Sequence, residues 1–186
     1  MSIEKLRWMV FASLMAALTA VGAYIHIPIG PVPIVLSTLF VILSGLLLGS
    51  RWGAASMALY LLVGAIGIPV FAGGKGGLAH FLGPTGGYLF GYLISSWITG
   101  LISERSRHLL IRDVIAVLIG SLILYGCGVP WLKIVTQMSW PRALLVGMVP
   151  FLIGDAIKAF VVVILVRSVR PMLNRISRAP SPYSHS

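Results

Sequence analysis

The chain has 186 residues, of which 58% are apolar and only 10% are charged. Soluble domains of this size usually carry about a quarter charged residues, and 14 basic and four acidic side chains do not cover a globule this apolar. The composition therefore excludes an ordinary cytosolic enzyme and a disordered chain, and it indicates a single domain with lipid as its solvent.

Six apolar segments predict membrane-spanning helices, because crossing a hydrocarbon core of about 30 Å takes roughly 20 helical residues. In chain order they are residues 8–25, 34–48, 53–71, 88–103, 114–129 and 143–166. The second segment is short for a bilayer, so we expect neighbouring residues to extend or shield it. The predicted fold is an all-α integral membrane protein with six helices in one bundle.

The segments between these helices carry the residues that end helices. Residues 26–33 contain three prolines, each of which lacks a backbone donor and clashes with the preceding helical turn. Residues 73–87 are rich in glycine, and residues 104–108 predict a charged turn. Residues 130–141 predict a loop or a surface-lying segment whose two tryptophans suit the headgroup level.

Lysine and arginine are distributed unequally between the two ends of the predicted helices. With the N-terminus inside, the inner ends carry Lys5, Arg7, Arg51, Arg105, Arg107, Arg112, Arg167, Arg170, Arg175 and Arg178. The outer ends carry Lys75, Lys133 and Arg142. The positive-inside rule predicts that both termini are cytoplasmic, with residues 167–186 as a basic tail. Topology and anionic lipid thus account for the net charge of +10 without nucleic-acid binding.

Asp155 and Lys158 are the only ionisable residues deep within a predicted span. A charged residue at the bilayer centre costs about 2.5–3.5 kcal/mol on insertion scales, so we expect both to face the bundle interior or a wet cavity. Their spacing of three places them on one helix face. They form either an internal ion pair or a pair that also binds a polar ligand, and the second interpretation is favoured because intramembrane ionisable groups usually mark function.

Glycine occupies seven of the fifteen residues from 73 to 87. Such backbone can turn sharply and approach a ligand closely, although a plain flexible loop has the same composition. A phosphate-binding P-loop is excluded, because Gly76 follows Lys75 where that motif needs Ser or Thr.

Small residues recur every four positions on two predicted helices. They are Ala12, Ala16 and Ala20 on the first and Gly87, Gly91, Ser95 and Thr99 on the fourth. Such strips let helices approach closely in lipid. We expect internal packing on the fourth helix, whereas the strip on the first is either internal packing or a surface for a separate protein.

Motifs for catalysis and metal binding are sparse. The single cysteine, Cys127, excludes an internal disulfide and a cysteine-based metal cluster, and we expect no metal site. A membrane-embedded enzyme using Asp155 with His26 or His80 is a rival hypothesis, but both histidines fall in predicted outer loops. A second rival hypothesis is a structural subunit in which the acid–base pair only stabilises the helix bundle.

Four motifs together resemble the BioY family, the biotin-binding S components of energy-coupling factor (ECF) vitamin transporters. The motifs lie at residues 30–33, 60–74, 82–89 and 154–158, and the resemblance covers nearly all of residues 5–170. Its strongest part is the run Gly-Pro-Thr-Gly-Gly-Tyr combined with Asp and Lys in the last helix. The nearest alternative is a sister S component for a different vitamin. One departure is that the family often has Thr and Gln at the start of helix two, where this chain has Val35 and Ser37.

The resemblance implies a cell-membrane protein with both termini inside that captures biotin from the outer side. It implies partners, a transmembrane coupling protein and two cytoplasmic ATPases, onto which Ala12, Ala16 and Ala20 dock. ATP is then used only by the partners, and this chain is not an enzyme and has no cofactor.

The resemblance also implies a biotin site. Asp155 and Lys158 are expected as polar ligands, with Thr85, Gly86 and Tyr88 near the pocket. Phe71 and Tyr88 are expected to cover the vitamin's ring, and the glycine segment, with Gly73 and Gly74, is expected to close above it.

Overall fold

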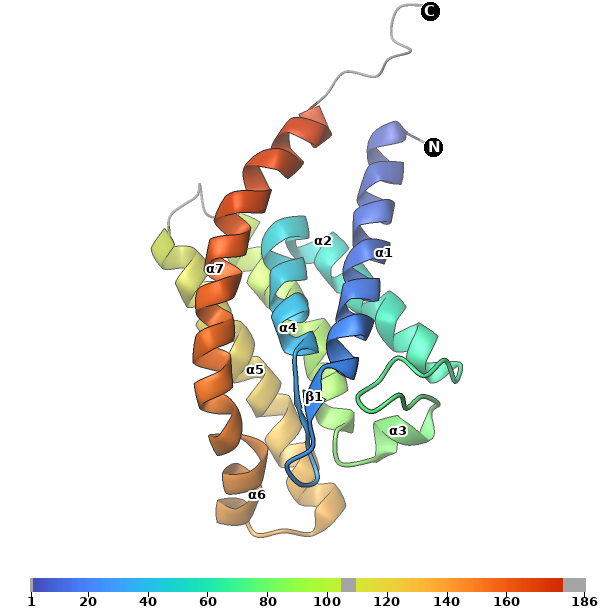
Figure 1. Cartoon of the computed structure of the whole chain (residues 1–186), viewed down its shortest axis with the longest axis vertical. Coiled ribbons are helices and arrows are strands. Elements are labelled where there is room, and N and C mark those ends of the chain that lie inside the picture. The colour runs from blue at the N-terminus through green and yellow to red at the C-terminus, as the bar shows by residue number, and fades with distance from the viewer. Residues whose placement is uncertain (1, 105–109, 179–186) are drawn as a thin grey trace, which may run out of the picture.

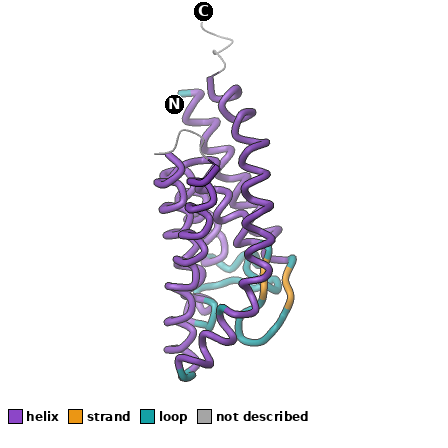
Figure 2. Tube along the Cα trace, turned by 90° about the vertical axis from the view of Figure 1, so that its left-hand side faces the viewer, coloured by secondary structure: helices purple, strands orange, loops and turns teal. Residues whose placement is uncertain are grey.

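The computed structural model describes residues 2–104 and 110–178. Its elements are α1 (Ile3–Tyr24), β1 (His26–Ile27), β2 (Ile34–Val35), α2 (Ser37–Ala65), α3 (Ala79–Leu82), α4 (Gly86–Glu104), α5 (Leu110–Thr136), α6 (Trp140–Gly147) and α7 (Val149–Arg178). The long helices run roughly along one axis (Figures 1 and 2). The strands and α3 lie toward one end, whereas α1 begins and α7 ends at the other.

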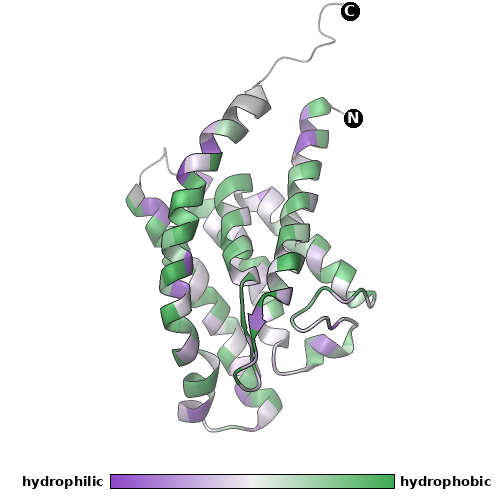
Figure 3. Cartoon of the chain, viewed as in Figure 1, coloured by the Kyte–Doolittle hydropathy of each residue, from purple (hydrophilic) through white to green (hydrophobic). Residues whose placement is uncertain are grey.

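The outer surface of the bundle is strongly apolar. Four segments are long and apolar enough to cross a membrane, namely Ile3–Tyr24, Ser37–Ala65, Ile111–Thr136 and Trp140–Met172. Large apolar side chains face outward, among them Leu122, Ile153 and Phe160, which are 68–77% exposed. Hydrophobic residues colour much of the outside of the helices (Figure 3). These are features of a multi-pass membrane protein, as the composition predicts.

Most of the predicted second and third spans lies in α2, which is bent at Gly49. The predicted start at residue 34 was wrong, because Ile34 and Val35 form β2. Gly49 has φ 79° and ψ −178°, so the chain leaves the helical conformation there and starts a second helical half. Glu104 caps that half: the Ser50 N–H donates to its Oε1 at 2.7 Å. The predicted end at residue 71 was wrong, because α2 stops at Ala65, just before Gly67 with φ 102°.

The remaining helix boundaries differ from the prediction around two prolines. The loop predicted from Pro130 was wrong, since α5 continues through Pro130 to Thr136. The neighbours Val129 and Leu132 are buried, and their packing offsets the lost backbone hydrogen bond. The predicted last span is divided at Met148 between α6 and α7, and Pro150 lies in the first turn of α7, where a proline fits.

Two predicted polar segments lie partly outside the described residues. Of the charged turn at 104–108, Glu104 ends α4, and residues 105–108 are not described. Of the predicted tail at 167–186, residues 167–178 continue α7 as a helix, and residues 179–186 are not described.

The small-residue strip of α4 packs inside the bundle, as predicted. Gly87, Gly91, Ser95 and Thr99 are all buried. A Cβ at Gly87 would lie 2.3 Å from the Cβ of Trp131 on α5, and the Ser95 hydroxyl donates to the Gly120 carbonyl at 2.9 Å. The strip thus sets the close approach of α4 and α5.

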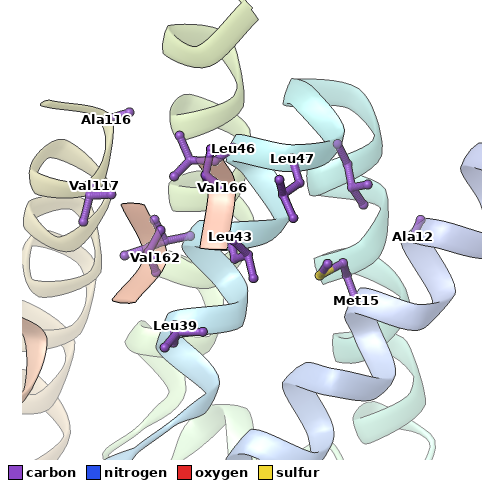
Figure 4. Packing of buried hydrophobic residues seen from close by; sticks show 12 residues of the cluster. Ala12, Met15, Leu39, Leu43, Leu46, Leu47, Ala116, Val117, Val162 and Val166 are labelled. Atoms are coloured by element: carbon purple, nitrogen blue, oxygen red, sulfur yellow. The ribbon is translucent and has the colours of Figure 1, made fainter. Parts of the chain in front are cut away.

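The strip on α1 is also covered by the chain itself. Ala12 and Ala16 are buried, and Ala12 lies with Met15 of α1 in a cluster with leucines of α2 and valines of α7 (Figure 4). The outward face of α1 instead carries Val10 and Leu14, which are both exposed. Of the two interpretations of this strip, the structure shows internal packing for Ala12 and Ala16.

The proline segment interrupts the helices, as predicted, and it forms a short hairpin, which was not predicted. Strand β1 pairs antiparallel with β2, with His26 opposite Val35 and Ile27 opposite Ile34. Val32, in the connection, is buried against Leu132 of α5. The hairpin therefore closes one side of the space between the helices.

Candidate functional site

A cavity lies between α2, α4, α5, α7 and the hairpin. Ligand sites for small molecules usually have apolar walls with a few polar groups. The side chains that line this cavity fit that description, since most are aromatic or aliphatic. The charged groups Asp155 and Lys158 meet at one place.

That place is a polar cluster of four residues from three helices: Thr38, Tyr125, Asp155 and Lys158. The Lys158 ammonium donates to Asp155 Oδ1 at 3.0 Å and to Thr38 Oγ1 at 2.9 Å. The Tyr125 hydroxyl donates to Asp155 Oδ2. The Lys158 and Asp155 side chains are 14% and 17% exposed, and all four residues line the cavity. The acid and the base are therefore paired and still face the hollow.

The polar cluster keeps hydrogen-bonding capacity for a ligand. A carboxylate accepts about four hydrogen bonds, of which Tyr125 and Lys158 supply two to Asp155. An ammonium has three N–H donors, of which Thr38 and Asp155 take two from Lys158. A ligand group with both N–H donors and a carbonyl oxygen matches what remains.

The cluster lies at the deep end of the cavity. A smaller hollow shares Thr38, Asp155 and Lys158 with it and extends to Val162, about two turns further along α7 than Asp155. In that direction α7 runs toward the end of the molecule where α1 begins (Figure 1).

Aromatic rings form one wall of the cavity. The Tyr60 and Tyr92 rings stack at 6.1 Å, and Phe71 meets Tyr60 edge-on at 5.6 Å. Phe71 is fully buried, because Gly64 leaves room for it: a Cβ at Gly64 would lie 2.1 Å from Phe71 Cζ. The wall suits a flat apolar ring system.

Two tyrosine hydroxyls in the cavity walls form hydrogen bonds within the protein. Tyr92 shares a hydrogen bond of 2.7 Å with Ser37 Oγ, and Tyr88 donates to the Gly147 carbonyl at 2.6 Å. The rings are therefore fixed before a ligand arrives.

A second hollow, the vestibule, adjoins the cavity and is lined by none of the residues of the polar cluster. Both hollows are lined by Pro33, Ala72, His80 and Thr85, so they are adjacent. His80 Nε2 is 3.2 Å from Thr85 Oγ1, and its ring stacks on Phe71 at 5.2 Å. Burial, together with the nearby Lys75 ammonium, lowers the pKa of His80, so its imidazole is neutral at pH 7.

Comparison with known proteins identifies the family. The family model described as the BioY family matches residues 1–175. The chain belongs to the BioY family. It is 43% identical over 153 residues to a probable biotin transporter BioY from Pyrococcus horikoshii, covering 82% of this chain and 90% of that protein. It is 40% identical over 160 residues to the biotin transporter BioY of Thermotoga maritima, covering 86% and 94%.

A solved structure has the same fold. The S-component for biotin from an ECF-type ABC transporter superposes on this chain with a TM-score of 0.85 at 31% identity. The similarity covers 92% of this chain and 95% of that one. The predicted resemblance to BioY is therefore confirmed.

The fold of this BioY chain brings five of the eight predicted site residues to the cavity: Phe71, Thr85, Tyr88, Asp155 and Lys158. The three glycines behave differently.

Gly73 lines the vestibule instead of the cavity. Gly74 lies in the turn after Phe71, with φ 69°, and its N–H donates to the Phe71 carbonyl at 3.0 Å. Gly86 is buried where a Cβ would lie 1.8 Å from the Phe81 carbonyl oxygen, so its part is close backbone packing at the start of α4. Among the described lining residues of the two hollows, Gly74 and Gly86 do not occur.

Sequence reasoning missed Thr38, Tyr92, Tyr125 and Phe151, all of which line the cavity. A hydroxyl or an aromatic ring in a membrane helix is common, so neither stands out as a signal. Thr38 is relevant to the start of helix two, where this chain departs from the residues that are common in the family. Val35 and Ser37 both line the cavity, and Thr38 supplies that helix's contact with Lys158.

Proposed function

We propose that this chain is the substrate-binding membrane subunit of an ATP-driven ECF transporter, and that its substrate is biotin. The observation that carries the proposal is the polar cluster at the deep end of an aromatic cavity, where Asp155 and Lys158 face the hollow. The relatives named above, which are called biotin transporters, support it.

The chemistry of biotin fits the cavity. Biotin has two ureido N–H donors beside a polarised carbonyl, an apolar thioether ring and a carboxylate tail. Asp155 accepts from a ureido N–H, and Lys158 donates to an oxygen of the ligand. Tyr88 and Phe71 belong to the walls that cover the ring.

Biotin arrives from the outer side in this proposal. We count six crossings: α1, the two halves of α2 on either side of Gly49, α4, α5 and α7. The hairpin and α3, which contribute residues to the vestibule, lie away from the end where α1 begins and α7 ends (Figure 1), and that end carries most of the basic residues. The positive-inside rule then supports cytoplasmic termini and an outward-facing vestibule.

In this proposal, delivery of biotin into the cell requires two kinds of partner: a transmembrane coupling protein and two cytoplasmic ATPases. Only these partners use ATP. The similarity to an S-component of an ECF-type ABC transporter supports this assembly. Docking through Ala12, Ala16 and Ala20 belongs to the same proposal, and it requires α1 to present Ala12 and Ala16, which the chain itself covers in this structure.

The test is isothermal titration calorimetry of biotin with the purified protein in detergent. Asp155→Asn keeps the size of the side chain and removes its charge. A hydrogen bond to a charged group contributes about 1.5–3 kcal/mol, so we expect biotin affinity to fall at least tenfold while the protein still inserts into the membrane. Glu4→Gln makes the same chemical change on the exposed first turn of α1 and should bind like the wild type. An unchanged affinity for Asp155→Asn would reject the site.

A ligand panel tests the substrate itself. Thermal unfolding with biotin, thiamine, riboflavin or niacin should show stabilisation by biotin. Stabilisation by another vitamin instead would identify a sister S component, and stabilisation by none would favour a structural subunit.

A further inference from the structure

The faces of α5 and α7 that meet next to the polar cluster carry small residues. Ser121 lies one turn before Tyr125 on α5, and Ala159 lies one turn after Asp155 on α7. The Tyr125 side chain is long enough to reach the Asp155 carboxylate, whereas Ser121 and Ala159 are too short to fill the space between the two helices. Both small residues line the smaller hollow, which therefore exists because two short side chains meet there.

The lining of the smaller hollow combines polar groups with buried apolar walls. Ser121 shares this hollow with the Asp155 and Lys158 side chains. Val117 on α5 and Val162 on α7 also line it, and both are at most 2% exposed. Such walls offer no hydrogen bonds, so a polar group that faces the hollow needs a partner inside it.

Two groups at the smaller hollow have hydrogen-bonding capacity left. Within the part of the chain that the structure describes, the Ser121 hydroxyl has no hydrogen-bond partner. The Asp155 carboxylate accepts from Tyr125 and Lys158, which leaves about two of its four acceptor positions. A hydroxyl that can donate and a carboxylate that can accept thus line one hollow. A water molecule, which both donates and accepts, joins such a pair.

The charges at the smaller hollow favour a neutral occupant. The Lys158 ammonium lies 3.0 Å from Asp155 Oδ1, so the two charges balance. Lys158 would repel a second cation and Asp155 would repel an anion, in a place where water screens weakly. Water is neutral, and it is small enough for the space that one short side chain on each helix leaves.

We propose that the smaller hollow is a water site, in which one ordered water accepts from the Ser121 hydroxyl and donates to the Asp155 carboxylate. Ser121 is then a positioning residue for Asp155: Tyr125 holds the carboxylate directly, and Ser121 holds it through the water. The orientation of the carboxylate matters because one of its remaining lone pairs is available to the substrate. The role in substrate binding rests on the proposed function, whereas the water site does not.

Threonine and valine at position 121 have the same shape and differ only in the hydroxyl. Biotin is titrated calorimetrically in detergent into Ser121→Thr and Ser121→Val. We expect Ser121→Val to bind biotin about threefold to tenfold more weakly than Ser121→Thr, as for the loss of one hydrogen bond. Crowding by the larger side chain affects both variants alike, so the difference reports the hydroxyl.

A double-mutant cycle tests whether Ser121 acts through Asp155. Both changes at position 121 are repeated in the Asp155→Asn background, where a neutral amide replaces the carboxylate and binds water more weakly. The difference between threonine and valine should shrink there to within about twofold. A role of Ser121 in helix packing alone predicts the same difference in both backgrounds.

The water itself is tested without biotin, in crystal structures of the ligand-free wild type and of Ser121→Val at a resolution that shows ordered waters. We expect a density peak within hydrogen-bond distance of Ser121 Oγ and an Asp155 carboxylate oxygen in the wild type. The peak should be lost in Ser121→Val.

Three outcomes overturn the inference. If the wild-type crystals show no density peak between Ser121 and Asp155, the water site does not exist. If Ser121→Val binds biotin as tightly as Ser121→Thr, or if their difference persists in full beside Asp155→Asn, Ser121 does not position Asp155. If the wild type does not bind biotin, the proposed function fails together with the positioning role, and the crystal structures alone decide the water site.

Discussion

Thr38 and Asp155 hold the Lys158 ammonium from two different helices. Thr38→Val has nearly the same shape but lacks the acceptor that lies 2.9 Å from Lys158 Nζ. We expect about fivefold to tenfold weaker biotin binding by calorimetry, because a hydrogen bond to a charged group is worth about 1.5–3 kcal/mol and part of it is regained by solvent. Thr38→Ser keeps the hydroxyl and should bind normally. Equal affinities for the two variants would show that Lys158 does not depend on Thr38.

Single residues were predictable where their chemistry conflicts with their surroundings. Asp155 and Lys158 stand out because ionisable groups are costly in an apolar helix. Tyr125 and Thr38 do not, and their contact with the pair depends on how α5 and α2 are aligned with α7. Glycine was a poor guide for a related reason: it indicates what the backbone does, as at Gly86, and not what that backbone faces.

Packing between whole helices can be tested at Gly87 on α4. A Cβ there would lie 2.3 Å from Trp131 Cβ and 2.5 Å from the Cys127 carbonyl oxygen, so α4 and α5 must move apart. We expect Gly87→Ala to destabilise the protein by about 1–3 kcal/mol, as overpacking usually does. The measurement is thermal unfolding in detergent.

The control for Gly87→Ala is Gly126→Ala on α5. Nothing lies within 4 Å of a Cβ at Gly126, and alanine favours a helix over glycine, so this variant should be as stable as the wild type or more so. If the two alanine variants unfold alike, close approach of α4 and α5 at Gly87 does not limit stability.

The type of each secondary-structure element was predicted better than its boundaries. The apolar runs indicated helices correctly, and the prolines of 26–33 correctly ended α1. Pro130 was misleading, because a proline's local cost is offset by packing that the sequence does not display. The break at Met148 was missed although Gly147 ends α6 just before it and Pro150 lies in the first turn of α7 just after it.

On the scale of the molecule, Arg170 joins four helices at the end where α7 stops. Its guanidinium donates to both carboxylate oxygens of Asp113 on α5 at 3.1 Å. It also donates to the Leu46 carbonyl of α2 at 2.9 Å and to Ser103 Oγ of α4 at 2.8 Å. The Asp113 side chain is only 4% exposed, so it depends on this partner.

Arg170→Met should therefore lower thermal stability in detergent strongly. Breaking a buried ion pair costs about 3–5 kcal/mol, because one charge stays buried and unpaired. The double variant with Asp113→Asn should recover part of that loss, and Arg167→Met, at an exposed position of α7, should have little effect. Biotin affinity, measured well below the unfolding temperature, should be unchanged. Unfolding of Arg170→Met at the wild-type temperature would contradict this account.

The placement of charges anticipated one feature of the whole molecule, since α1 begins and α7 ends at the same end (Figure 1). Which side of the membrane that end faces stays a prediction from the positive-inside rule. The full outline of the cavity could not be predicted, because it is bounded by residues from six helices, the hairpin and the loops beside α3, whose relative positions no local pattern specifies.

The turn at Gly49 has a consequence for the order in which the protein is built. A buried backbone amide needs a partner, and the amide that opens the second half of α2 is satisfied by Glu104, 54 residues later in the chain. The bend at Gly49 therefore reaches its final hydrogen bonding only once α4 has come to lie beside both halves of α2, so this part of the bundle matures as a three-helix unit and not one helix at a time.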